Sequence, residues 1–287
     1  MITHGQVVEK ISRHLAGLYP ETEIDCFTHI LFKRYLNMSR SHIYIMYHDE
    51  ISTGVEAKFD AAIAELKEYK PIQYIVGETE FYGLPIEVTP DVLIPRPETE
   101  ELTDWIVSEY SHDAGFTMVD VGTGSGCIAV ALATRFPNAN VWAVDVSQAA
   151  LNVAQRNALK NRVKIHFLLH DALKDDLMGF ERNSLDLVVS NPPYVTPSEK
   201  SRLQPNVLNY EPHDALFSRD DDPLIFYKRI TSFGLQCLKD NGRIFFEMNE
   251  NHHQEISDIL KQFGYKDVIP RKDFFGKWRM ISARKSS

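Results

Sequence analysis

The chain has 287 residues, and its 31 Lys and Arg against 40 Asp and Glu give a formal net charge of −9 at pH 7. This charge argues against a protein that coats nucleic acid with its general surface. Hydrophobic residues make up 44% and charged residues 25%, which is typical of a globular chain and excludes a disordered or fibrous one. Three widely separated cysteines, Cys26, Cys127 and Cys237, can build neither a disulfide framework nor a zinc cluster.

The N-terminal segment lacks the basic start and the apolar run of a signal peptide. No apolar stretch approaches the ~20 residues that a membrane span requires. We therefore expect a cytoplasmic protein that does not associate with membranes. The His252-His253 pair lacks the H-E-x-x-H spacing of a zinc site, so we predict no metal site there and interpret it as a solvated helix start.

Apolar residues recur every three or four positions in the first quarter of the chain, as at Val7, Ile11 and Leu15. This spacing predicts a small helical domain over residues 1–70. Within it, residues 43–47 are apolar enough to form either a helix or a strand.

The pattern changes at residue 71. Two short strands are predicted at 72–75 and 81–88, broken by Gly77 and Gly83. We interpret residues 71–95 as a β-hairpin linker. A helix is then expected to begin near Pro97, because carboxylates in its first turns complement the helix dipole.

From residue 117 onward, strands and helices alternate, which is typical of a doubly wound, mostly parallel sheet. A catalytic α/β domain is therefore predicted over residues 96–287. Strands are expected at 117–121, 141–146, 163–168, 185–190, 243–248, 265–270 and 278–283, and helices at 127–134, 148–159 and 223–238.

A glycine-rich motif, Asp-Val-Gly-Thr-Gly-Ser-Gly, occupies residues 120–126 between a predicted strand and a predicted helix. Glycines at such a turn let a ligand approach the backbone closely. The dinucleotide fingerprint is G-x-G-x-x-G, and here Cys127 stands where its third glycine belongs. This spacing of the three glycines disfavours a nicotinamide dehydrogenase and favours an adenosyl ligand without a pyrophosphate.

Acidic residues follow the next two strands. Asp145 is placed to bind both ribose hydroxyls of a nucleoside through charge-assisted hydrogen bonds, although it can also serve only to cap the helix after Ser147. Asp171 can accept a hydrogen bond from an adenine amino group or simply form a turn. Together with the glycines, these positions predict S-adenosyl-L-methionine as the cofactor.

The strongest functional signal in the sequence is Asn191-Pro192-Pro193-Tyr194, directly after a predicted strand. Prolines lack an N–H donor and fix the backbone, so carbonyls in this turn can face a ligand. We expect the Asn191 side-chain oxygen and the Pro192 carbonyl each to accept one N–H of a planar, poorly nucleophilic amino group. That arrangement aims the nitrogen at the sulfonium methyl and stabilises the positive charge developing on it, while Tyr194 flanks the planar group. In isolation the tetrapeptide can also be an ordinary proline turn.

With these motifs the sequence resembles the PrmC/HemK family of release factor glutamine methyltransferases over nearly the whole chain. The Ile-Pro-Arg-Pro-Glu-Thr-Glu stretch at 94–100 is more specific than N-P-P-Y, which many amino-methyltransferases share. Further matching segments are Pro-Ile-Gln-Tyr-Ile-Val-Gly at 71–77, Phe-Tyr-Gly at 81–83, Glu211-Pro212 and Ala215-Leu216.

The resemblance implies a class I (Rossmann-like) S-adenosylmethionine-dependent methyltransferase with a seven-stranded, mostly parallel sheet. It implies methylation of the glutamine side-chain nitrogen in the Gly-Gly-Gln motif of class 1 peptide chain release factors, with the helical domain holding that partner. S-adenosyl-L-homocysteine is then the product, and we expect a monomer without stable nucleic-acid binding. The implied catalytic residues are Asn191, Pro192 and Tyr194, and Pro193 joins them in binding substrate. Together, the motifs and the resemblance predict cofactor binding by Gly122, Thr123, Gly124, Ser125, Gly126, Asp145, Asp171, Ala172 and Asn191; of these, the resemblance itself implies the glycine loop, Asp145 and Asn191.

The resemblance does not settle the role of a few positions. Ala172 stands where members often carry an aromatic residue, so a contact there must be smaller or made by the backbone. The segment 247–250 lacks the glycine expected after its strand. Arg96 and Glu98 match positions near the site, but can equally belong to the start of a helix.

Two other functions compete with this interpretation. An adenine or guanine exocyclic-amine methyltransferase acting on DNA or RNA uses the same motif, but it needs a basic channel that the acidic composition argues against. A non-catalytic binding subunit would have no evident use for an intact Asn191 and glycine loop.

Overall fold

The computed structural model describes residues 2–113, 115–174, 178–219 and 222–286. The chain divides into two compact units. One consists of Met1–Glu78 with Gln204–Tyr210, and the other of Thr79–Leu203 with Glu211–Ser287. Each unit has its own cluster of buried hydrophobic residues.

The first unit is helical, and residues with the predicted three- and four-residue spacing form its core. Val7, Ile11 and Leu15 are each 0% exposed. Thr3 caps the first helix by accepting a hydrogen bond from the Gln6 backbone N–H at 3.2 Å, which satisfies a donor that the helix leaves free. The helices are α1 (His4–Leu15), α2 (Glu21–Leu36), α3 (Arg40–Ile45), α4 (Thr53–Lys67), α5 (Ile72–Val76) and α9 (Pro205–Tyr210). The ambiguous segment 43–47 therefore begins in a helix.

The predicted strand at 72–75 is wrong, because these residues lie in helix α5. Ile72, Tyr74 and Val76 are buried, so the segment is a short apolar run whose periodicity cannot distinguish a strand from a buried helix. Gly77 ends the helix in the left-handed conformation, with φ at 76°, which glycine adopts without a side-chain clash.

The hairpin predicted in this region is confirmed, but the bounds of its strand at 81–88 are wrong. The chain turns at Tyr82 and Gly83, between β1 (Glu78–Phe81) and β2 (Leu84–Glu87), which make a two-stranded sheet. Its turn residues Tyr82 and Gly83 both have positive φ, 52° and 75°, as tight hairpin turns require. The Tyr82 backbone N–H donates to Glu100 Oε1 at 2.8 Å, which helps to hold this conformation.

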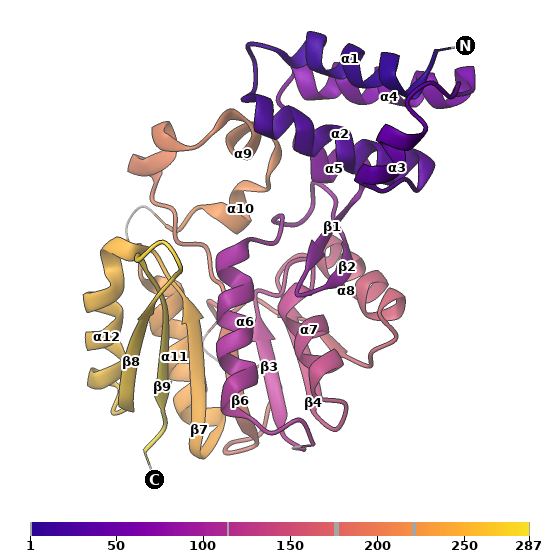
Figure 1. Cartoon of the computed structure of the whole chain (residues 1–287). Coiled ribbons are helices and arrows are strands. Elements are labelled where there is room, and N and C mark those ends of the chain that lie inside the picture. Colours follow the sequence, from indigo (N-terminus) through magenta and orange to yellow (C-terminus); the bar gives the residue numbers. More distant parts are fainter. Residues whose placement is uncertain (1, 114, 175–177, 220–221, 287) are drawn as a thin grey trace. The chain divides into compact units, whose positions relative to one another are not determined.

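The second unit contains a seven-stranded sheet in the order β5-β4-β3-β6-β7-β9-β8 (Figure 1). β3 to β7 are parallel, whereas β9 runs antiparallel to both β7 and β8. The strands are β3 (Thr117–Val121), β4 (Asn140–Asp145), β5 (His166–Leu169), β6 (Leu185–Ser190), β7 (Leu238–Glu247), β8 (Lys266–Lys272) and β9 (Trp278–Arg284). This confirms the predicted fold class.

Two strands of this sheet start well away from their predicted first residue, whereas its other strand bounds agree with the prediction to within two residues. β5 starts only at His166, where its pairing with Trp142 of β4 begins, rather than at residue 163. β7 starts at Leu238, opposite Leu185, five residues earlier than predicted. In both cases the pairing partner sets the limit of the strand, and local sequence does not contain that information.

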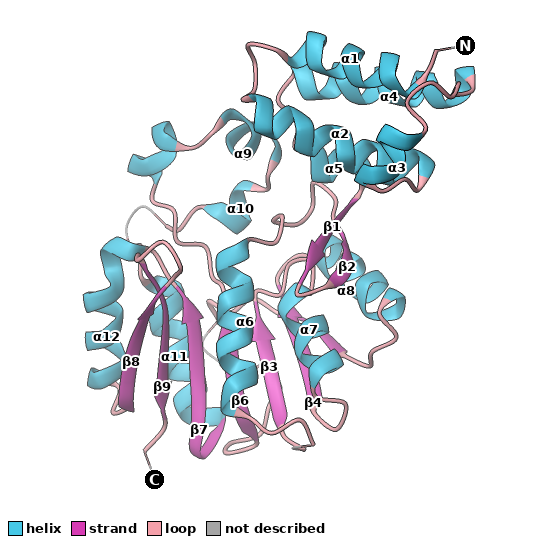
Figure 2. Ribbon diagram, in the orientation of Figure 1, coloured by secondary structure: helices cyan, strands magenta, loops and turns pink. Residues whose placement is uncertain are grey.

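Helices cover the sheet, with α6 and α7 in front of the strands in the view of Figure 2 and α11, labelled in Figure 1, behind them. α6 begins at Pro97 as predicted, since a proline at the first helical position loses no intrahelical hydrogen bond. α12 begins at His253, which confirms the helix start predicted there. The helices of this unit are α6 (Pro97–Glu109), α7 (Cys127–Arg135), α8 (Gln148–Lys160), η1 (Pro197–Arg202), α10 (His213–Leu216), α11 (Ile225–Cys237), η2 (Glu250–His252) and α12 (His253–Gln262).

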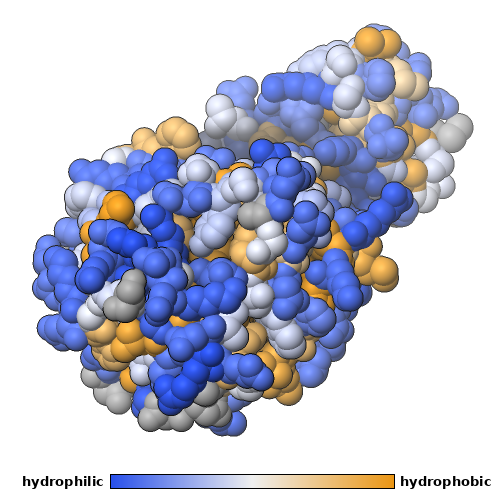
Figure 3. Space-filling model, turned by 90° about the horizontal axis from the view of Figure 1, so that it is seen from below, coloured by the Kyte–Doolittle hydropathy of each residue, from blue (hydrophilic) through white to orange (hydrophobic). Residues whose placement is uncertain are grey.

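Hydrophilic residues cover most of the face shown in Figure 3, with hydrophobic residues interspersed among them. Across the described ranges, no helix is long and apolar enough to cross a membrane.

Candidate active site

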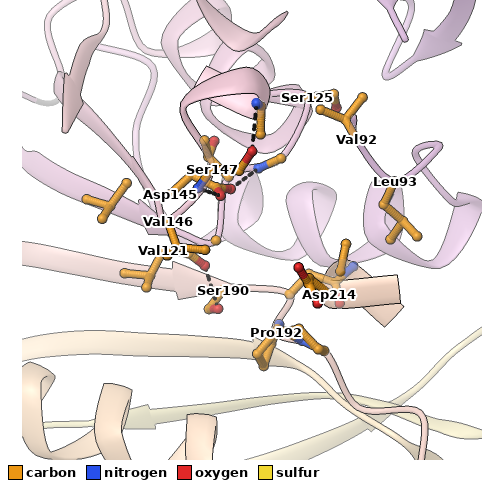
Figure 4. Close-up of a pocket in the computed structure, with 18 of the residues that line it drawn as sticks. Val92, Leu93, Val121, Ser125, Asp145, Val146, Ser147, Ser190, Pro192 and Asp214 are labelled. Atoms are coloured by element: carbon orange, nitrogen blue, oxygen red, sulfur yellow. Dashed lines mark hydrogen bonds between the residues drawn. The ribbon is translucent and has the colours of Figure 1, made fainter. Parts of the chain in front are cut away.

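A cavity of about 350 Å³ opens at the carboxyl ends of the central parallel strands, where open α/β sheets bind their ligands. In Figure 4, Asp145 and Ser147 lie on one side of it, Val92 and Leu93 on another, and Pro192 and Asp214 on a third. Its volume falls at the lower end of the range for small-molecule sites. The predicted site residues that line it are Gly122, Thr123, Gly124, Ser125, Asp145, Asp171, Ala172, Asn191, Pro192 and Pro193.

The glycine loop presents bare backbone to this cavity. Gly122 and Gly124 have φ of 75° and 55°, and a Cβ built on either would meet no atom within 4 Å. The positive φ explains why glycine stands there. The open space beside the backbone is what a bound group needs for close approach.

Gly126 lies in the same loop but does not line the cavity. A Cβ on Gly126 would lie 2.9 Å from the Ala154 Cβ in α8, and its φ is 78°. Its role in the structure is to let α7 start close against α8, a packing role distinct from that of the first two glycines.

Asp145 stands at the end of β4 with 8% of its surface exposed. One carboxylate oxygen accepts the Gly124 backbone N–H at 2.8 Å and the other accepts the Ser147 N–H at 2.9 Å. Burial raises the pKa of this carboxyl, while these backbone donors oppose that rise. The helix cap itself is Ser147, whose side chain accepts the Ala150 N–H, so capping α8 does not require the Asp145 carboxylate.

Asp171 and Ala172 follow β5 and both line the cavity. Asp171 Oδ1 accepts the Leu173 backbone N–H at 2.9 Å, which is the turn-forming bond that the sequence also allowed. The side chain of Ala172 packs against the hydrophobic core of the second unit.

The N-P-P-Y motif leaves the sheet directly after β6. Ser190, the last strand residue, donates its hydroxyl to the Val121 carbonyl at 2.6 Å, which ties the motif to the strand that leads into the glycine loop. The Asn191 amide nitrogen donates to Thr99 Oγ1 at 3.2 Å. The two loops that carry the sequence motifs therefore meet at one cavity.

Tyr194 does not line this cavity. Its hydroxyl donates to Glu247 Oε1 at 3.0 Å, and Glu247 Oε2 accepts the Thr99 hydroxyl at 2.6 Å. Burial raises the pKa of the Glu247 carboxyl, and these two donors oppose the rise. Burial and the neighbouring Glu247 charge also raise the pKa of Tyr194, so the phenol remains protonated.

Arg96 forms an ion pair with Glu211, whose side chain is 1% exposed. The second oxygen of Glu211 accepts the Ile94 backbone N–H at 3.2 Å. A buried carboxylate needs such partners to offset its lost hydration. The pair fastens the segment before α6 to the segment after the N-P-P-Y motif, which gives Arg96 a structural role beside the site.

Several lining residues carried no usable signal in the sequence. Val92 and Leu93 lie in a proline-rich loop without periodicity. The Asp214 carboxylate falls between two segments of the family resemblance and has an exposed position in α10. Further lining residues that sequence reasoning did not single out are Pro90, Asp91, His170, Phe226 and Ile230.

Two family models match the chain. The model described as the PrmC N-terminal domain matches residues 6–77, and the model described as the methyltransferase small domain matches residues 99–209. Among solved structures, a methyltransferase from Pyrococcus furiosus has a TM-score of 0.51 at 19% identity and covers 82% of this chain and 100% of its own. That likeness supports the methyltransferase fold.

Curated relatives are considerably more similar. A release factor glutamine methyltransferase of Flavobacterium psychrophilum is 42% identical over 270 residues, covering 93% of this chain and 94% of the relative. One of Bacteroides thetaiotaomicron is 38% identical over 98% of this chain and 100% of its own length, and one of Streptococcus pneumoniae is 38% identical over 88% of each. With such identity along nearly its full length, and with both sequence motifs at one cavity, the chain belongs to the family of release factor glutamine methyltransferases.

Proposed function

We propose that this protein transfers a methyl group from S-adenosyl-L-methionine to the side-chain nitrogen of the Gly-Gly-Gln glutamine in class 1 peptide chain release factors. The observation that carries the proposal is the meeting of the N-P-P-Y turn and the glycine loop at one cavity in a member of this family.

The cavity suits this cofactor by its chemistry. Gly122 and Gly124 leave open space beside their backbone, and the Asp145 carboxylate keeps lone pairs beyond those used by Gly124 and Ser147. A carboxylate with free lone pairs can accept from two ribose hydroxyls. When bound, the cofactor supplies an electrophilic methyl group on a sulfonium sulfur. Asp171 and Ala172 would flank its base.

The residues of the N-P-P-Y turn would prepare the acceptor. The lone pair of an amide nitrogen is delocalised into its carbonyl, so the nitrogen must be oriented before it attacks. Asn191 Oδ1 and the Pro192 carbonyl would each accept one N–H of the glutamine amide, and Pro193 would help to shape the pocket. Such positioning can contribute up to ~7 to 11 kcal/mol. The two acceptors also stabilise the positive charge that develops on nitrogen.

The partner and setting belong to the same proposal. The helical domain at residues 1–70, joined by the linker at 71–95 to the catalytic domain at 96–287, would help to hold the release factor. We expect the protein to be a monomer and to be cytoplasmic, since translation termination takes place in the cytoplasm.

The test is a radiolabelled methyl-transfer assay. Purified protein and labelled S-adenosyl-L-methionine are mixed, separately, with a class 1 release factor, the same factor with its Gly-Gly-Gln glutamine changed to alanine, bulk DNA and bulk RNA. We expect label in the unmodified release factor and none in the other three. Label only in nucleic acid would reject the proposed substrate and assign the protein to the base-methylating enzymes.

A further inference from the structure

Glu247 is a buried acidic residue that neither sequence motif includes. It is the last residue of β7 and is 1% exposed. Its two carboxylate oxygens accept hydroxyl hydrogens from Thr99 and Tyr194, at 2.6 and 3.0 Å. A carboxylate removed from water is costly unless such donors satisfy it. The hydroxyls of Thr99 and Tyr194 therefore hold the Glu247 carboxylate in its buried place.

Thr99 connects this carboxylate to the N-P-P-Y turn. Thr99 is the third residue of α6 and is 3% exposed. A hydroxyl has one hydrogen and two lone pairs. Because Glu247 Oε2 accepts the single hydrogen of the Thr99 hydroxyl, only lone pairs of Thr99 Oγ1 remain for Asn191.

Asn191 therefore has one possible orientation beside Thr99. Its amide NH₂ must face the hydroxyl oxygen, as the 3.2 Å contact from Nδ2 to Thr99 Oγ1 records. The other end of the same amide, Oδ1, is then the end left to accept a hydrogen bond from a ligand in the cavity that Asn191 lines. The reverse orientation would leave Asn191 presenting a donor to the N–H groups of a substrate amide.

We propose that Glu247 is a positioning residue that acts through Thr99 to fix the Asn191 amide with its oxygen toward the methyl acceptor. The inference rests on the proposed function, in which that oxygen accepts an N–H of the glutamine. The same carboxylate also holds the Tyr194 hydroxyl, so it fixes the first and the last residue of the turn together. Hydrogen bonds in such a chain polarise one another, which strengthens Asn191 Oδ1 as an acceptor.

The primary test compares two valine variants on one helix. Thr99→Val removes the relay hydroxyl at nearly constant volume. Thr103→Val is the matched control, because Thr103 is also buried in α6 and its hydroxyl donates to the Thr99 backbone carbonyl, at 3.0 Å, rather than to Glu247. We expect kcat to fall about 10- to 100-fold in Thr99→Val, less than the 10²- to 10³-fold lost when a stabilising group itself is deleted. Thr103→Val should keep the wild-type kcat.

Three further measurements separate positioning from folding. Thr99→Ser restores a hydroxyl and should return kcat close to the wild-type value. The dissociation constant for S-adenosyl-L-methionine, measured by calorimetry, should stay unchanged in all three variants, because Asp145 and the glycine loop remain. Circular dichroism and thermal unfolding report the folded fraction, so that kcat is given per folded molecule.

The second test concerns the direction of the hydrogen-bond chain. Glu247→Gln keeps the shape but introduces an NH₂ that can donate to Thr99, which lets the chain and the Asn191 amide reverse. We expect a fall in kcat of about 10- to 100-fold here too. Combined with Thr99→Val, the loss should be well below the product of the two single losses, because both changes break one chain.

The outcomes distinguish an incorrect substrate assignment from an incorrect role for Glu247. The acceptor is whichever substrate the wild-type protein labels in the preceding assay, so an incorrect substrate assignment is read from the wild type alone. Wild-type kcat in folded Thr99→Val, no rescue by Thr99→Ser, or multiplicative losses in the double variant would each overturn the positioning role of Glu247.

Discussion

Replacing Asp145 by alanine tests whether the cavity binds the ribose of S-adenosyl-L-methionine. The Asp145 carboxylate is 8% exposed, and each oxygen already accepts one backbone N–H, from Gly124 and from Ser147. Two further hydrogen bonds to an ionised group are worth about 1.5 to 3 kcal/mol each. Because the oxygens share their charge with backbone donors, we take the lower end, about 3 kcal/mol in total or a loss of about 100-fold in affinity.

Isothermal titration calorimetry with S-adenosyl-L-methionine measures this loss directly. Asp91→Ala is a matched control, since Asp91 also lines the cavity but is exposed and bonds to the Thr89 hydroxyl at 3.0 Å. Affinity should remain close to wild type in the control. The affinity should also depend on pH, because only the ionised Asp145 carboxylate can accept from both ribose hydroxyls. Burial raises the pKa of Asp145. On acidification, the affinity for S-adenosyl-L-methionine should therefore begin to fall at a higher pH than it would with an aspartate of normal pKa. An unchanged dissociation constant in Asp145→Ala would refute the assigned role.

Three other changes give distinct outcomes. Asn191→Ala should abolish methyl transfer while calorimetry still detects cofactor binding, and full activity would reject the proposed mechanism. Gly126→Ala should lower the free energy of unfolding in urea by about 2 to 3 kcal/mol, because it adds the 2.9 Å contact with Ala154 to the cost of a φ of 78°. Gly179→Ala, also at a φ of 78° but with nothing within 4 Å, should lose only the conformational part, and equal losses would contradict the packing role of Gly126. Burial raises the pKa of Asp120 from 3.8 to about 7, so the folded state binds this proton more tightly than the unfolded state. The associated stability is complete below pH 3.8 and is lost as pH rises through 7. Relative to Asp120→Asn, the wild type should therefore lose about 2 to 3 kcal/mol between pH 5 and pH 8, and parallel pH profiles of the two proteins would refute this.

The sheet and its two ligand loops could be predicted from sequence because their signals are local. An apolar strand followed by glycines marks residues 120–126, and an apolar strand followed by Asn-Pro-Pro-Tyr marks residues 191–194. In a parallel sheet the carboxyl ends of strands lie at one edge. Knowing the strand pattern therefore brings the two motifs to the same edge without any knowledge of side-chain packing.

The secondary structure of short apolar segments could not be predicted from local sequence in the same way. Residues 72–75 have the composition of a strand, but they form α5 between Pro71 and the left-handed Gly77. A five-residue run does not reveal its period. The break at Gly83 was predicted, but the part that Tyr82 plays in the turn was not, because a positive φ is unusual for tyrosine. The Tyr82 backbone N–H is bound by Glu100, which lies 18 positions away in α6.

The sequence by itself determined the fold class, the family and the positions of the glycine and N-P-P-Y loops, because each depends on residues that are neighbours in the chain. Only the tertiary structure decided how those loops are held. Thr99 and Glu247 are 148 positions apart and their side chains lie 2.6 Å from each other, and Arg96 reaches Glu211 across 115 positions. Hydrogen bonds act over a few ångströms, so a partner exists only after β6, β7 and the start of α6 have come together, and no local pattern specifies that meeting.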